Sequence, residues 1–140
     1  MSLHGVGLAL ENKPNKIFVF PDITLKPGEF VLVYCDKGAS SSLTGEQHAP
    51  FTLGGSGSEL FLFDAGQNLL DRTQVPALNT DEAWCRVDGD TWIRTNAPTP
   101  GARNSRSVNR AQRDGDVCLS EAMASNACAF FDEDGDAPDY

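Results

Sequence analysis

The sequence of 140 residues lacks a long hydrophobic run, because no apolar stretch approaches the roughly 20 residues that a helix needs to span a bilayer. Basic residues are also few, with 11 Lys and Arg against 20 Asp and Glu and a formal net charge of −9. Since phosphate neutralisation dominates nucleic-acid affinity, this balance argues against such a partner. We therefore expect no membrane span and no nucleic-acid partner.

Metal-binding and targeting signals are scarce too. Two histidines and four cysteines, none in a CxxC pair, do not complete a convincing zinc set. No signal peptide is visible after Met1, and the abrupt start suggests a fragment of a longer chain. The cysteines favour small buried residues or free thiols, with one disulfide as the alternative; they are Cys35, Cys85, Cys118 and Cys128.

Charge changes along the chain and marks its parts. Residues 1–102 carry twelve acidic against seven basic side chains, whereas residues 103–113 carry four arginines and no acid. Residues 114–140 carry eight acids and neither Lys nor Arg. An arginine-bearing linker is thus expected to join a mildly acidic domain to a strongly acidic tail.

The chain is organised around residues 18–38. A Lys-Pro-Gly-Glu turn precedes the apolar run 30–35, and Pro27 and Gly28 supply the backbone angles of a tight turn. The run has aromatic and β-branched residues on both alternating faces, so neither face is suited to water. Such a strand requires cover on both sides, which one sheet packed against another supplies.

A hairpin is predicted where residues 59–63 and 68–73 flank a turn, with Gly66 at the left-handed position. In its first strand, alternate leucines share one face and alternate phenylalanines the other. The other predicted strands are 6–10, 17–20, 30–35, 51–53 and 91–94, with loops expected over 36–50 and most of 75–90. A helix competes with a strand only over 119–129. This pattern predicts an all-β fold, an antiparallel sandwich.

The candidate motifs for chemistry are incomplete. Residues 54–58 lack the last glycine of GxSxG, and His4 and His48 have no sequence-local partner, so exposed loop histidines are expected. In Asp132–Asp136 the glycine stands at the fourth position, whereas an EF-hand calcium loop needs it at the sixth. This favours a solvated turn over a calcium site. We expect no catalytic, metal-binding or cofactor-binding residues and no cofactor.

The tryptophans and arginines each leave an alternative open. Trp84 and Trp92 are expected in the core or as a lid, and the alternative is a ligand groove. Arginines between the domain and the tail are expected to pair internally or stay solvated, and the alternative is contact with phosphates; they are Arg103, Arg106, Arg110 and Arg113.

Four segments carry a resemblance to a known family: GVGLALENKPNKIFVFPD, LKPGEFVLVYCDKG, HAPFTLGGSGSELFLFDAGQNLLDRTQVP and DEAWCRVDGDTWIRTNAPTPGARN. Together, over roughly residues 3–104, they resemble the lamin-tail domain family, including its terminal Pro-Thr-Pro-Gly-x-x-Asn. The resemblance implies an immunoglobulin-like β-sandwich. It also implies the bacterial branch, whose modules are appended to secreted or surface proteins, often near spore-coat-type kinase domains or hydrolases.

The chain departs from this family in two places. Family domains open with a strand similar to SE-x-M-A-S-N, an acidic loop and a second apolar strand, and nothing before residue 3 supplies them. A similar opening stands at 119–126, and Cys85 replaces a usual small glycine. The resemblance therefore implies three parts: a lamin-tail-like domain without its first strands at 1–104, a linker at 105–116, and the opening strand and acidic loop of a second copy at 117–140.

A sandwich without an edge strand exposes unpaired backbone groups beside an apolar slot. We expect residues 117–123 to fill it by strand addition, within the chain or in a second copy. The expected function is a non-catalytic interaction or spacer module of a larger bacterial protein, extracellular or at the cell surface. Its partners would be other domains of that protein or another protein. The alternative is an accessory domain that binds a polysaccharide or another envelope polymer for an attached enzyme.

Overall fold

The computed structural model describes residues 1–12, 17–38, 45–104 and 117–126, which form strands and turns without a helix. Accordingly, the described part contains no helix that could cross a membrane. Its strands are β1 (Gly7–Ala9), β2 (Phe18–Val19), β3 (Val33–Tyr34), β4 (Gln47–His48), β5 (Ser58–Phe63), β6 (Leu69–Val75), β7 (Ala83–Asp88), β8 (Thr91–Thr95) and β9 (Glu121–Met123).

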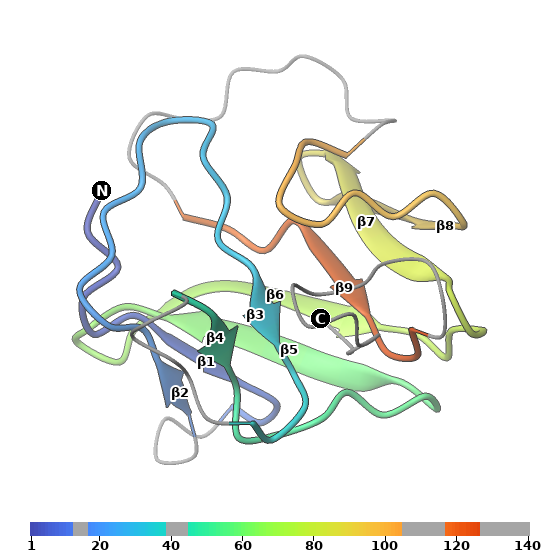
Figure 1. Ribbon diagram of the computed structural model, residues 1–140, viewed down its shortest axis with the longest axis horizontal. Coiled ribbons are helices and arrows are strands. Elements are labelled where there is room, and N and C mark those ends of the chain that lie inside the picture. Colours follow the sequence, from blue (N-terminus) through green and yellow to red (C-terminus); the bar gives the residue numbers. More distant parts are fainter. Residues whose placement is uncertain (13–16, 39–44, 105–116, 127–140) are drawn as a thin grey trace.

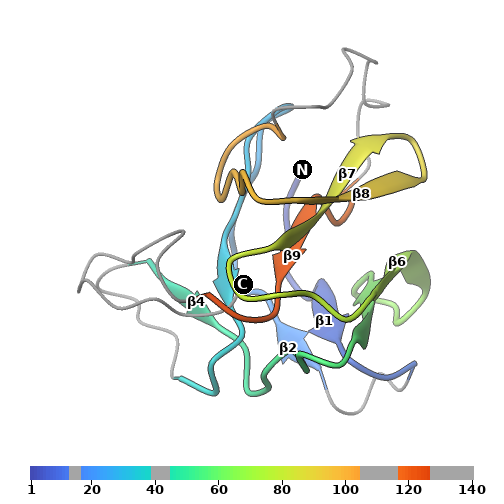
Figure 2. The ribbon, with the colours of Figure 1, turned by 90° about the vertical axis from the view of Figure 1, so that its right-hand side faces the viewer.

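Two antiparallel sheets form the layers of the molecule. One has the order β2-β1-β5-β6 and the other the order β8-β7-β9, and the two lie one above the other in Figure 1 and again in Figure 2. A third pair, β3 and β4, is parallel and lies in the chain between β2 and β5. The predicted all-β, antiparallel sandwich is therefore confirmed, with this parallel pair as an exception.

The hairpin of β5 and β6 is the longest pairing. As predicted, its alternating residues divide between two apolar clusters: Leu60 and Leu62 face the central core, whereas Phe61 and Phe63 pack on the opposite face. The turn differs from the prediction, because Gln67 and not Gly66 has the positive φ angle, at 65°. Both faces of the four-stranded sheet are thus covered by apolar side chains.

Three local predictions were wrong. The predicted strand 51–53 has only an isolated bridge between Thr52 and Asp36, while β4 lies in a stretch predicted as loop. Most of 75–90 was also predicted as loop, yet β7 occupies Ala83–Asp88. In the described part of 119–129 a strand forms and not the competing helix.

The apolar run 30–35 behaves only partly as predicted. Its turn forms, with Gly28 at a φ angle of 81° and a hydrogen bond from Glu29 N to Lys26 O at 3.1 Å. However, only β3 within the run joins a ladder. Residues 30–32 therefore run extended beside the core without a strand partner among the described residues.

Candidate interaction site

Strand β9 is brought from beyond the linker to the edge of the three-stranded sheet. It runs antiparallel to β7, with Ala122 opposite Trp84. Two backbone hydrogen bonds extend the pairing beyond the strand ends: Arg86 N donates to Ser120 O at 2.8 Å, and Asp81 N donates to Ser125 O at 2.7 Å. We call residues 117–126 the tail segment; together with its partners it forms the candidate site.

The tail segment contributes to two apolar clusters. Ala122 and Ala124 belong to the central core, while Met123, whose exposed fraction is 0%, packs with Ala83 and Cys85 on the other face of β7. This alternation is what a strand with both faces covered requires. Removing the segment would therefore expose apolar surface on both sides of the sheet.

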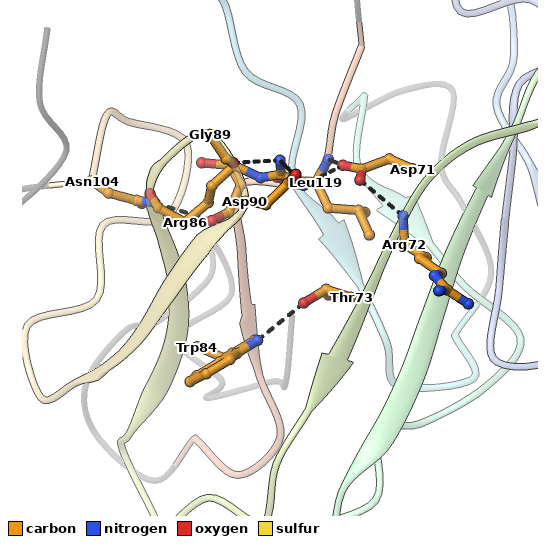
Figure 3. A network of polar contacts seen from close by, with 10 residues as sticks. Asp71, Arg72, Thr73, Trp84, Arg86, Gly89, Asp90, Asn104 and Leu119 are labelled. Atoms are coloured by element: carbon orange, nitrogen blue, oxygen red, sulfur yellow. Dashed lines mark hydrogen bonds and ion pairs between the residues drawn. The ribbon is translucent and has the colours of Figure 1, made fainter. Parts of the chain in front are cut away.

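Charged side chains hold the start of the tail segment, as Figure 3 shows. Arg86 Nε donates to Leu119 O at 2.9 Å, and Leu119 N donates to Asp71 Oδ2 at 2.9 Å. Arg86 Nη2 also pairs with Asp71 Oδ2, and the two side chains are only 16% and 15% exposed. The Arg86–Asp71 pair thus satisfies both backbone groups of Leu119, and it ties β6 and β7 to the tail segment.

The Pro-Thr-Pro-Gly-x-x-Asn stretch holds the same segment from the other side. Asn104, which is buried, donates from Nδ2 to Ser120 O at 3.0 Å and to Arg86 O at 2.7 Å. Thr99 donates from its backbone N and from Oγ1 to Glu121 Oε2, both at 3.0 Å. This stretch was expected only as the terminal motif of the resembled family, whereas its polar Thr99 and Asn104 bind the tail segment.

Cys85 lies opposite Glu121 in the ladder and is buried. Burial raises the pKa of its thiol far above the ordinary value of 9.0, and the hydrogen bond and charge of Glu121 raise that pKa further. Cys35 and Cys118, like Cys85, are not joined in a disulfide, so the three described cysteines agree with the expectation and not with its disulfide alternative. Cys128 lies outside the described residues.

The two tryptophans stack on each other, with ring centroids 6.1 Å apart, and both are half-buried. Trp84 donates from Nε1 to Thr73 Oγ1 at 3.0 Å, and Arg86 lies 4.8 Å from the Trp92 ring centroid. An open groove of about 540 Å³ runs between them and β6. Trp84 packs against the central core, so its predicted place in the core agrees with the structure, while Trp92 borders the groove.

The prediction of an isolated, exposed His48 was wrong. This half-buried residue lies on β4, and its Nδ1 is 2.9 Å from Asp36 Oδ2. Gly38 is required here, because a Cβ would lie 2.6 Å from His48 Nδ1 and 2.8 Å from Asp36 Oδ1. The carboxylate orients the imidazole and links the chain after β3 to β4; His4 is exposed, as predicted.

The other candidate residues lie in a turn or outside the described part of the chain. Asp88-Gly89-Asp90 forms the turn between β7 and β8. Within the described part, no group of three or more His, Cys, Asp or Glu side chains is arranged to hold a metal ion. Outside the described residues lie Asp132–Asp136, Arg106, Arg110 and Arg113.

Comparison of the chain with protein-family models, with curated proteins and with solved structures found no match.

Proposed function

We propose that the chain is a non-catalytic interaction or spacer module of a larger bacterial protein, extracellular or at the cell surface. The bacterial and surface assignments rest on the resemblance of residues 3–104 to the lamin-tail family. The interaction role rests on β9, a strand separated from the rest of the sheet by the linker and held at its edge. A module that binds an edge strand in this way can link two segments of polypeptide through main-chain hydrogen bonds.

The contacts of the tail segment support binding of a separable strand. Its pairing uses mostly backbone groups, and Arg86, Asp71 and Asn104 also bind its main chain at Leu119 and Ser120. These contacts require an extended backbone more than a particular side chain at each position. Met123 supplies the buried anchor that favours one register over a shift by one residue.

Deleting residues 114–140 tests the proposal. We expect the melting temperature to fall by about 10 °C or more, which corresponds to roughly 2 kcal/mol in a domain of this size. Adding a synthetic peptide of residues 117–126 should restore it in a concentration-dependent way. The same peptide with Ala122→Pro lacks the N–H that faces Trp84, so it should not restore the melting temperature. If the deletion leaves both the melting temperature and the oligomeric state in solution unchanged, the proposal is contradicted.

A second candidate, binding of a polysaccharide or another envelope polymer, is favoured by the groove beside Trp92. Aromatic faces with nearby polar side chains bind the apolar faces of sugars, and this groove also contains Arg72 and Gln74. Retention of the full chain on chitin or peptidoglycan, lost in Trp92→Ala and kept in Phe30→Ala, would support it. If neither polymer retains the chain, polymer binding is rejected and only the proposal of an interaction module remains.

A further inference from the structure

An apolar groove lies between the four-stranded sheet and the tail segment. Its volume is about 250 Å³, and Leu8, Leu60 and Leu62 form its floor. Its walls are residues 28–33 on one side and 117–122 on the other. Residues of the segment that leads into β3 and of the segment that leads into β9 line the same groove.

The first wall has unsatisfied backbone groups. Phe30, Val31 and Leu32 are partly exposed, and Phe30 and Val31 make no backbone hydrogen bond among the described residues, whereas the pairing of Val33 with Gln47 directs Leu32 C=O toward Gln47 N. Unpaired main-chain groups beside an apolar surface are a template for a further strand. An acyl chain or another apolar molecule would fill the groove but leave these groups unpaired.

The second wall continues an interface that already works by strand pairing. Strand β9 is at the edge of the order β8-β7-β9, so one of its edges has no strand beside it among the described residues. Arg86 N bonds to Ser120 O, and backbone bonding alternates along an antiparallel pair, so the backbone groups of Glu121 and Met123 point away from β7. The groove is therefore bordered by two backbone edges.

We propose that the groove binds one extended polypeptide strand with apolar side chains at alternate positions. Its main chain pairs with the edge of this segment that faces away from β4, at Val31, and its apolar side chains contact the leucines of the floor. Phe30, which is 37% exposed at the groove, covers the bound strand. This proposal rests on the interaction function above and names the chemistry of the partner.

The test uses the full chain, labelled with 15N, and the probe peptide Thr-Val-Thr-Leu-Thr-Val-Lys. We expect the peptide to shift the amide signals of residues 30–32 and to slow their hydrogen exchange at least tenfold. Phe30→Ser should weaken binding about tenfold or more, because the covering aromatic surface is lost. Leu70→Ser is the matched control, since Leu70 is 40% exposed on β6 away from the groove, and it should bind like the parent.

Decanoate serves as a second probe. If decanoate shifts the methyl signals of the leucines while the peptide leaves the amides of residues 30–32 unprotected, the groove is an acyl site and the proposal is overturned. It is also overturned if the peptide shifts only signals elsewhere. Either result leaves the binding of β9 intact, because that is tested separately by the deletion of residues 114–140.

Discussion

The two antiparallel sheets differ in what holds their outer strands. In the four-stranded sheet, β5 and β6 are joined by a short turn and pair over their whole length, and apolar clusters cover both faces. In the three-stranded sheet, β9 pairs over three residues and arrives from beyond the linker. Its main chain is then held by Arg86, Asp71 and Asn104.

This difference shows which contacts offset the entropic cost of ordering a strand that is far along the chain from its partner. A hairpin closes at little entropic cost, so its ladder of hydrogen bonds and the burial of β5 are enough to hold its strands. A short strand on a tether must recover the entropy of its ordering from a few residues. Buried hydrogen bonds to its main chain, each costly to leave unmade, supply specificity that three ladder residues cannot.

The largest expected effect comes from the four-stranded sheet. Leu62→Ala should lower the free energy of unfolding by about 3 to 4 kcal/mol, because this 2% exposed side chain leaves a cavity in the central core. Both tryptophans lie in β7 and β8, so their fluorescence reports on the other sheet. Urea unfolding followed by fluorescence and by circular dichroism should shift equally. Separate midpoints would show that the sheets unfold independently.

Arg86→Ala should lower the free energy of unfolding by about 3 kcal/mol, because it leaves the largely buried Asp71 carboxylate without its cationic partner and Leu119 O without the Arg86 donor. Arg94→Ala is the control, since Arg94 is exposed on β8 and should change stability by less than about 0.5 kcal/mol. Chemical denaturation measures both. Equal losses in the two variants would mean that the pair does not hold the tail segment.

Much of the fold could be predicted because its signals are local. The alternation of Leu60 to Phe63 fixed the two faces of β5, and Pro27-Gly28 fixed a turn. Strand β7 was not predicted because most of residues 75–90 were expected to form loop, and its apolar residues become buried only against β8, β9 and Leu32. The side-chain contacts of the site could not be predicted, because Arg86, Asp71 and Asn104 acquire their role only when the tail segment lies between them.

Glu121→Gln tests how much a single carboxylate of the tail segment contributes to its binding. The amide still accepts one hydrogen bond from Thr99 but without charge, so we expect a loss of about 1 kcal/mol. It should also lower the pKa of Cys85, which stays above its ordinary value because burial is the larger cause.

The 13Cβ chemical shift of Cys85, followed by NMR against pH, measures this pKa. Since the folded pKa of Cys85 exceeds the ordinary 9.0, the unfolded chain releases the proton first. The contribution of this thiol to stability is therefore complete below pH 9.0 and declines above it. Glu121→Asp, which keeps the charge, is the control, and an unchanged profile in Glu121→Gln would contradict a contact between the two groups.

The smallest effect is expected at the β5–β6 turn. Asp64 accepts hydrogen bonds from Asn68 N at 2.8 Å and from Asn68 Nδ2 at 2.9 Å, and these lower the pKa of its exposed carboxyl below the ordinary 3.8. A lowered pKa adds stability that is present above pH 3.8 and lost as the pH falls through the folded value. Asn68→Ala should return the pKa toward 3.8, as measured by carboxyl NMR titration, whereas Gln74→Ala should not. If the Asp64 carboxyl of the parent chain already titrates at 3.8, its side chain does not hold the turn. The contrast with the side-chain contacts around β9 then becomes sharper.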